Sequence, residues 1–202
     1  MNTLLVYLVS ISFLTLASLL LIRSAVRQDY LLLGHLKVWT ASLQALIFFI
    51  YGGFPIIYLP EYWPESGGNE IVGYSGYGIL AIGLSIILIN MFRLGIRQSL
   101  GLKTSRLKDT EFYKISRNPQ VLGCWIYIAG FVILWPSWYA VGWGISLAVV
   151  THSVIRTEEE HLRRLFGEEY ELYCKLVPRY FKFLGWRGTG PDGNITRNQE
   201  EE

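Results

Sequence analysis

The sequence has few charged residues and almost no cysteine. Asp, Glu, Lys and Arg make up only 17% of its 202 residues, whereas hydrophobic residues make up 51%. A soluble domain usually carries about 25% charged residues, so this composition predicts lipid as part of the solvent. The net charge of +2 does not indicate a nucleic-acid partner. The two cysteines, Cys124 and Cys174, exclude a disulfide framework and stand at no metal-ligand spacing, so we expect no bound metal.

Motifs of several soluble enzyme classes are also missing. The sequence has no Walker loop, no G-x-S-x-G elbow and no H-E-x-x-H helix, which argues against NTPases and common hydrolases. Residues 188–193 match the glycine pattern of a dinucleotide-binding loop, but no strand is expected before them and no helix after them. Because that pattern needs a strand–turn–helix context, we interpret the match as chance.

Four long intervals contain no charged residue: 1–22, 38–60, 71–92 and 118–155. A helix needs about 20 apolar residues to cross a bilayer, so each of the first three intervals supplies one span. The fourth is long enough for two spans, and Pro136 predicts a tight turn between them. We therefore predict an all-α integral membrane protein with five transmembrane helices, over about 1–22, 38–60, 71–92, 118–135 and 137–155. The last two form a C-terminal helical hairpin.

The basic residues indicate the orientation of these spans. All 18 lie in the first loop, the third loop or the region after the last span, whereas the second loop carries only acidic charge. By the positive-inside rule, the N-terminus is outside and the basic segments face the cytosol. The first span has no preceding basic residue and no small-residue cleavage site, so we expect it to be retained. The membrane would be the plasma membrane in a prokaryote or the endoplasmic reticulum in a eukaryote.

The rest of the chain predicts one domain, over residues 1–184, followed by a polar, disordered tail at 185–202. Apolar residues at mixed spacings of three and four predict a cytosolic amphipathic helix over 157–177, interrupted at Gly167.

Three places could carry chemistry. The first is the basic, Pro-containing turn at 110–123, which opens into the fourth span and could bind a carboxylate; it could equally be a lipid-phosphate anchor. The second is the cluster at 156–160, where Arg156 faces Glu159 and Glu160 one turn on, unless it is only a solvated helix start. The third is His152, an ionisable residue inside an uncharged span, which could be catalytic or simply hydrogen-bonded structure.

Together these segments resemble the isoprenylcysteine carboxyl methyltransferase family, whose superfamily includes membrane phospholipid N-methyltransferases. Its first motif is matched here by Thr110, Tyr113, Lys114, Arg117, Asn118, Pro119 and Gly123. Its second motif, E-E-x-x-L-x-x-x-F-G-x-x-Y-x-x-Y-x-x-x-V-P-R, is matched by Glu158, Glu159, Leu162, Phe166, Gly167, Tyr170, Tyr173, Val177, Pro178 and Arg179. The resemblance covers about 110–179, and the first three spans agree only in hydropathy.

The resemblance implies an S-adenosylmethionine-dependent methyltransferase. The cofactor-binding residues that it implies are Tyr113, Asn118, Pro119, Gln120, Val121, Gly123, Glu158 and Glu159. The catalytic residues would be Arg156, Glu159 and His152, with Arg156 near the arginine that orients the substrate in family members. Asn118 and Val121 replace a histidine and a tyrosine of the eukaryotic carboxyl methyltransferases, which leaves the substrate class less defined than the cofactor.

The methyl acceptor would be lipidic or prenylated and would reach the site from the membrane. A carboxylate acceptor is already ionised at neutral pH and needs an orienting arginine rather than a base. We therefore expect carboxyl methylation of an isoprenylcysteine-like substrate. Three alternatives stay open: a phospholipid N-methyltransferase with His152 as the base, an NADPH-dependent sterol reductase, and a non-catalytic membrane scaffold.

Overall fold

A computed structural model describes residues 3–58, 70–103 and 111–180, which form helices and no β-strand. The helices are α1 (Thr3–Leu21), the π-helical turn η1 (Ile22–Val26), α2 (Arg27–Leu33), α3 (Val38–Tyr58), α4 (Glu70–Leu94), α5 (Ile96–Ser99), α6 (Glu111–Ile115), α7 (Pro119–Leu134), α8 (Trp138–Phe166) and α9 (Glu168–Leu176). The prediction of an all-α protein is thus confirmed for the described residues.

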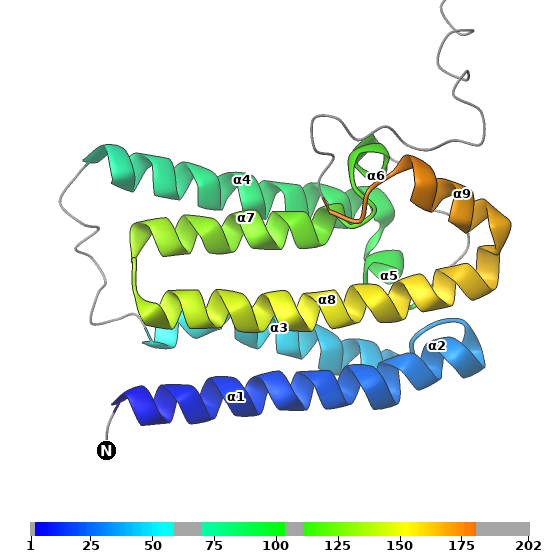
Figure 1. The fold of residues 1–202 in the computed structure, drawn as a ribbon, viewed down its shortest axis with the longest axis horizontal. Helices are drawn as coiled ribbons and strands as arrows, with labels where there is room; N and C mark the ends of the chain where they lie inside the picture. The colour runs from blue at the N-terminus through cyan, green and yellow to red at the C-terminus, as the bar shows by residue number, and fades with distance from the viewer. Residues whose placement is uncertain (1–2, 59–69, 104–110, 181–202) are drawn as a thin grey trace, which may run out of the picture.

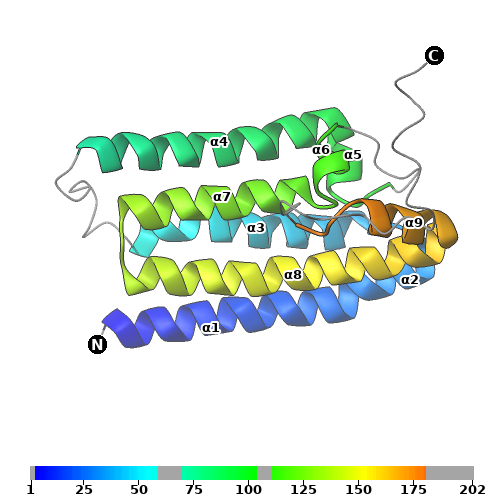
Figure 2. The same cartoon turned by 45° about the horizontal axis from the view of Figure 1, so that its top comes forward.

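The apolar helices α1, α3, α4, α7 and α8 run side by side, as Figures 1 and 2 show. Three helical stretches, Leu4–Leu33, Glu70–Leu94 and Trp138–Phe166, are long and apolar enough to cross a membrane. The other two apolar stretches are shorter, at Val38–Gly53 and Pro119–Leu134. The protein is therefore an integral membrane protein, whereas the number of five crossings stays a prediction.

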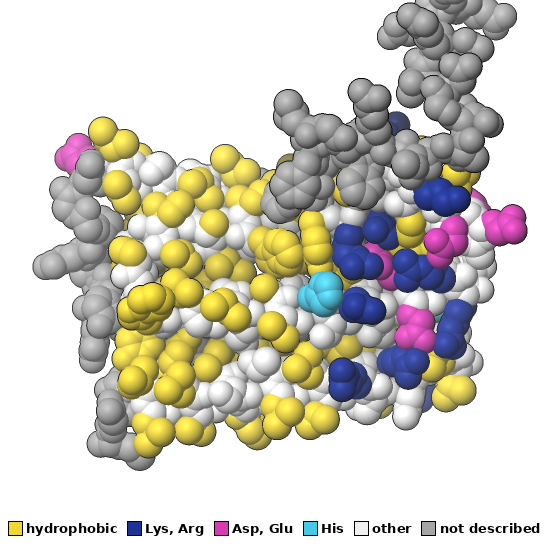
Figure 3. Space-filling view, in the orientation of Figure 1, with side chains coloured by type: hydrophobic (Ala, Val, Ile, Leu, Met, Phe, Trp, Pro, Cys, Tyr) yellow, Lys and Arg dark blue, Asp and Glu magenta, His cyan; other side chains and the backbone are white. Residues whose placement is uncertain are grey.

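Charge is concentrated at one end of this bundle. Hydrophobic side chains cover most of the face in Figure 3, and Lys, Arg, Asp and Glu gather at the end that holds α2, α5, α6 and α9 in Figure 1. We call this the polar end. The described parts of the three segments predicted to face the cytosol all lie there. This is the arrangement expected if successive spans cross the membrane in alternating directions.

Glycines hold α4 and α7 in backbone contact. A Cβ added to Gly130 would lie 2.7 Å from the backbone nitrogen of Leu80, and one added to Gly123 would lie 3.0 Å from the carbonyl oxygen of Gly83. Real Cβ atoms essentially never show the first distance, and the second is tighter than most real contacts, so glycine at these positions lets the helices approach closely.

The hairpin between α7 and α8 forms where the sequence predicts it. Helix α7 ends at Leu134 and α8 begins at Trp138. The Ser137 side chain accepts a hydrogen bond from the backbone N–H of Ala140, which is an N-cap interaction. In the bundle interior, the indole N–H of Trp143 donates to the carbonyl oxygen of Tyr51 at 3.0 Å.

The charged boundaries do not end the helices at the predicted residues. The first helical stretch continues past residue 22 to Leu33, and α8 continues past residue 155 to Phe166. Residues 157–166 therefore belong to α8, and the predicted amphipathic segment is divided between α8 and α9. The break at Gly167 is confirmed, because its φ of +51° is one that glycine adopts without strain. The predicted tail, 185–202, lies outside the described residues.

Candidate functional site

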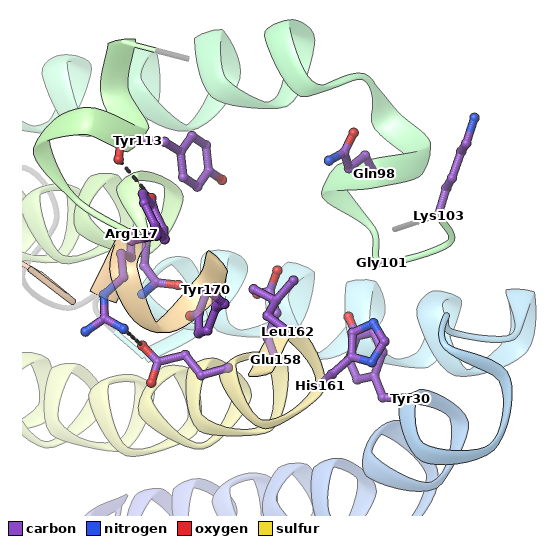
Figure 4. Close-up of a pocket in the computed structure, with 13 residues that line it drawn as sticks. Tyr30, Gln98, Gly101, Lys103, Tyr113, Arg117, Glu158, His161, Leu162 and Tyr170 are labelled. Atoms are coloured by element: carbon purple, nitrogen blue, oxygen red, sulfur yellow. Dashed lines mark hydrogen bonds and ion pairs between the residues drawn. The ribbon is translucent and has the colours of Figure 1, made fainter. Parts of the chain in front are cut away.

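A cavity that is partly open to solvent lies at the polar end (Figure 4). Its walls come from α2, the segment around α5, α6, the start of α7, the last turns of α8, and α9. The described residues that line it are Tyr30, Gln98, Gly101, Lys103, Tyr113, Arg117, Asn118, Glu158, Glu159, His161, Leu162, Tyr170 and Tyr173. Both sequence motifs therefore contribute to one cavity.

The first motif is locked to the end of the second through the backbone. The backbone N–H of Arg117 donates to the carbonyl oxygen of Pro178 at 3.0 Å. The carbonyl oxygen of Arg179 accepts from the Asn118 side-chain amide at 3.1 Å and from the Ser116 hydroxyl at 3.3 Å. These bonds join residues about 60 positions apart and fix Asn118 at the cavity wall.

Glu159 is the charged centre of the site. It is only 2% exposed, and its carboxylate pairs with the guanidinium of Arg179 through both oxygens, at 2.6 and 3.0 Å. Arg117 contacts the same carboxylate at 3.0 Å, and Arg163 lies 3.9 Å away. The hydrogen bond with Glu159 raises the pKa of Arg179 above its ordinary value. A buried carboxylate is stable here because it is paired so completely.

Two tyrosines of α9 cover the first motif. The Tyr173 hydroxyl donates to the carbonyl oxygen of Tyr113 at 2.8 Å, one of the dashed lines in Figure 4. Tyr170 is buried. Its burial and, to a smaller extent, the negative charge of Glu159 raise the pKa of its phenol. It is therefore a neutral phenol beside Arg117 at physiological pH.

Two buried nitrogen atoms of the cavity residues have no hydrogen-bond partner among the described residues. They are Nε of Arg117 and Nε2 of His161. The His161 ring stacks on Tyr30, with ring centroids 4.6 Å apart and planes within 17° of parallel. Buried polar atoms are almost always paired, so these two nitrogens are candidates for contact with polar groups of a ligand.

Of the implied cofactor residues, four line the cavity: Tyr113, Asn118, Glu158 and Glu159. Pro119 is buried at the first position of α7, where its fixed φ favours a helix start.

Three other implied cofactor residues are not among the described residues that line this cavity. Gln120 donates through its side-chain amide to the Ser99 hydroxyl at 3.0 Å. Val121 is half-buried. Gly123 faces α4, so its lack of a side chain serves helix packing. Their cofactor roles stay predictions. Successive residues of a helix point in different directions, and Asn118, at the start of α7, is the described residue of this segment that lines the cavity.

His152 and Arg156 lie on the same face of α8 as Glu159, two turns and one turn earlier respectively, and they too are absent from the described lining of the cavity. The ring nitrogen Nδ1 of His152 lies 2.6 Å from the Tyr180 hydroxyl, and Tyr180 packs on Trp125 at 4.6 Å between ring centroids. Arg156 is exposed. Of the three predicted catalytic residues, Glu159 alone thus lines this cavity.

Sequence reasoning missed part of the lining. For Arg117 the sequence allows two interpretations, part of a ligand-binding turn or a lipid-phosphate anchor, and it does not assign this residue to the cofactor. Tyr170 and Tyr173 were visible only as motif positions. Tyr30, Gln98 and His161 belong to neither motif's fixed positions, so the pattern carried no signal for them.

Comparison with known proteins agrees with this geometry. The model of a family described as phospholipid methyltransferase matches residues 72–169, which include α4, α7, α8 and most of the cavity residues. Over these residues, just under half of the chain, the protein is similar to membrane methyltransferases of this superfamily. The predicted resemblance is thereby confirmed.

A methanethiol S-methyltransferase of Crocosphaera subtropica (strain ATCC 51142 / BH68) is 26% identical over 133 residues. The alignment covers 54% of this chain and 47% of the relative, so the chain spans about half the length of the curated relative it matches. No solved structure matches the chain.

Proposed function

We propose that this membrane methyltransferase uses S-adenosylmethionine to methylate a lipid-like acceptor. One observation carries the proposal: the two motifs of the superfamily converge on a single cavity that combines buried charge, aromatic rings and unpaired polar atoms. The cavity lies where the apolar bundle meets the polar end, which suits a polar donor and an apolar acceptor.

The cavity residues fit the amino-acid half of S-adenosylmethionine. The unpaired Nε of Arg117 is a cationic donor suited to the carboxylate. Glu158 lines the same cavity and supplies negative charge for the ammonium group. Glu159 acts indirectly, because its carboxylate is already bonded to Arg117 and Arg179 and holds the first of these at the cavity.

When bound, the cofactor supplies a methyl group made electrophilic by its sulfonium sulfur. The residues of this chain then have two tasks, to align donor and acceptor and to exclude water. The aromatic residues Tyr113, Tyr170 and Tyr173 suit the second task, because they cover the cavity with largely apolar rings.

We favour a carboxylate acceptor of the isoprenylcysteine type. Arg156, exposed on the α8 face that also bears Glu159, is available to pair with a carboxylate at the membrane boundary. An acceptor with a long apolar chain would place that chain among the exposed apolar side chains of the bundle, such as Phe49 and Leu20.

A second candidate is supported by the contact between His152 and Tyr180. An amine or thiol acceptor must lose a proton, and a histidine hydrogen-bonded at 2.6 Å to a phenol can accept one. A phospholipid with an ethanolamine headgroup is the acceptor of this kind that we proposed from sequence. The reductase and scaffold alternatives gain no support from the family match.

We propose further that the polar end faces the cytosol. Its loops carry the basic residues, and the positive-inside rule favours this orientation. Cytosolic S-adenosylmethionine would then have direct access to the cavity.

Calorimetric titration of the detergent-purified chain with S-adenosylhomocysteine tests the cofactor. We expect saturable binding, weakened at least about tenfold by Arg117→Lys, because lysine cannot reproduce the guanidinium geometry. Arg164→Lys is the matched control, since Arg164 is exposed and pairs with Glu160 outside the cavity. Absence of binding by the folded wild-type chain would refute the proposed cofactor.

Transfer of labelled methyl groups to a prenylcysteine analogue and to phosphatidylethanolamine vesicles tests the acceptor. Carboxyl methylation that survives His152→Gln would support the first candidate. Ethanolamine methylation that is lost in the same variant, with S-adenosylhomocysteine binding intact, would support the second.

A further inference from the structure

The Tyr30–His161 pair forms one side of the cavity and has no assigned role. His161 comes from the last turns of α8 and Tyr30 from α2, so the pair joins the first helical stretch of the chain to the last apolar helix. Tyr30 lies outside residues 72–169, the part of the chain that the family model matches. Figure 4 shows the two stacked rings across the cavity from Arg117 and Tyr113.

The His161 ring is buried but incompletely paired. It is 4% exposed, and its Nε2 has no hydrogen-bond partner among the described residues. Burial lowers the pKa of the imidazole, so the ring is neutral at physiological pH. A neutral imidazole has one N–H donor and one acceptor nitrogen, and Nε2 is the acceptor when the proton is on Nδ1.

The two sides of the cavity differ in chemistry. Arg117, with Glu159 behind it, makes one side strongly charged. On the other side, Tyr30 and His161 present their stacked aromatic rings, and Lys103 is exposed and points away from His161 in Figure 4. The charged side suits an amino acid, and the aromatic side suits a nucleoside, which offers hydroxyl and amino donors on a flat apolar frame.

We propose that Nε2 of His161 accepts a hydrogen bond from the nucleoside half of the methyl donor, with Tyr30 holding the imidazole in place by stacking. The donor group is a ribose hydroxyl or the adenine amino group. The inference rests on the proposed function and assigns a recognition role to a residue between the fixed positions of the second motif.

The test asks whether His161→Phe and the removal of one ligand group abolish the same hydrogen bond, by comparing binding affinities. S-adenosylhomocysteine, its 2′-deoxy analogue, its 3′-deoxy analogue and S-inosylhomocysteine, which lacks the adenine amino group, are titrated into the wild-type chain and His161→Phe. Phenylalanine keeps a ring against Tyr30 but removes the acceptor. His35→Phe is the matched control, because His35 is exposed and is not among the described residues that line the cavity.

We expect His161→Phe to weaken binding of S-adenosylhomocysteine about tenfold, the order of one lost hydrogen bond, and His35→Phe to leave it unchanged. One of the three analogues should bind the wild-type chain about tenfold more weakly than S-adenosylhomocysteine, yet bind His161→Phe as well as S-adenosylhomocysteine does. That loss of discrimination identifies the bonded group, and general damage to the fold would not produce it.

Two results would overturn the inference while leaving the cofactor intact. One is unchanged binding of S-adenosylhomocysteine by His161→Phe. The other is an equal ratio between S-adenosylhomocysteine and every analogue in both proteins, which would mean that His161 contacts none of the altered groups. Failure of the wild-type chain to bind S-adenosylhomocysteine at all would instead refute the proposed function, and this inference with it.

Discussion

Replacing Glu159 by glutamine tests whether the buried carboxylate holds the site together. Glutamine keeps the shape of the side chain but removes the charge, so the guanidinium groups of Arg117 and Arg179 lose their shared anion. Breaking a buried ion pair by neutralising one partner typically costs about 3–5 kcal/mol. For a chain of about 200 residues, each kcal/mol lowers the melting temperature by about 2–4 °C. We therefore expect Glu159→Gln to lower Tm by about 6–20 °C.

The neighbouring residue provides a matched control. Glu160 also bonds two arginines, Arg27 at 2.9 Å and Arg164 at 2.8 Å, but its side chain is 33% exposed against 3% for Glu159. Exposed ion pairs contribute little because water screens them, so Glu160→Gln should change Tm far less. Thermal unfolding of the two variants in the same detergent, followed by intrinsic tryptophan fluorescence, makes the comparison. Equal shifts would refute the reasoning that burial, rather than the number of arginine partners, sets the effect.

Two further predictions concern the bundle, and the same unfolding assay checks both. Gly130→Ala should destabilise the protein by about 1–3 kcal/mol, because its Cβ would meet the α4 backbone. Gly78→Ala is the control and should not destabilise the protein, because the space around Gly78 is open. A similar loss of stability in both variants would contradict the close packing of α4 on α7. Tyr51→Phe should cost about 1 kcal/mol, because it removes the buried hydrogen bond at 2.7 Å to the Ser146 hydroxyl. Tyr74→Phe, at an exposed position, is its control, and no difference between the two would argue against that bond.

The helical architecture was predictable because its cause is local. Uncharged stretches mark the apolar helices, Pro136 marks the hairpin, and Gly167 marks the break before α9. The ends of helices were less predictable. A charged residue marks where hydrocarbon ends, but a helix ends where capping or a backbone break stops it, so α8 runs on through Arg156 to Phe166.

The residues of the site could be predicted only where they occupy fixed positions of a motif. Glu159 and Asn118 were found because the two motifs give their positions, and both line the cavity. Tyr30 was not predictable, because its contact with His161 joins residues 131 positions apart and depends on how α2 packs against α8. Gly123 was assigned to the cofactor through its motif, although a glycine in a helix can equally serve a close helix contact, as it does here.

The glycine contacts between α4 and α7 also bear on how an acceptor arrives from the bilayer. At Gly83 and Gly130 the two helices touch backbone to backbone, so no acyl or prenyl chain can pass between them. This seam is a closed wall on one side of the bundle. An acceptor of the proposed kind, dissolved in the bilayer, would therefore reach the polar end along another pair of helices.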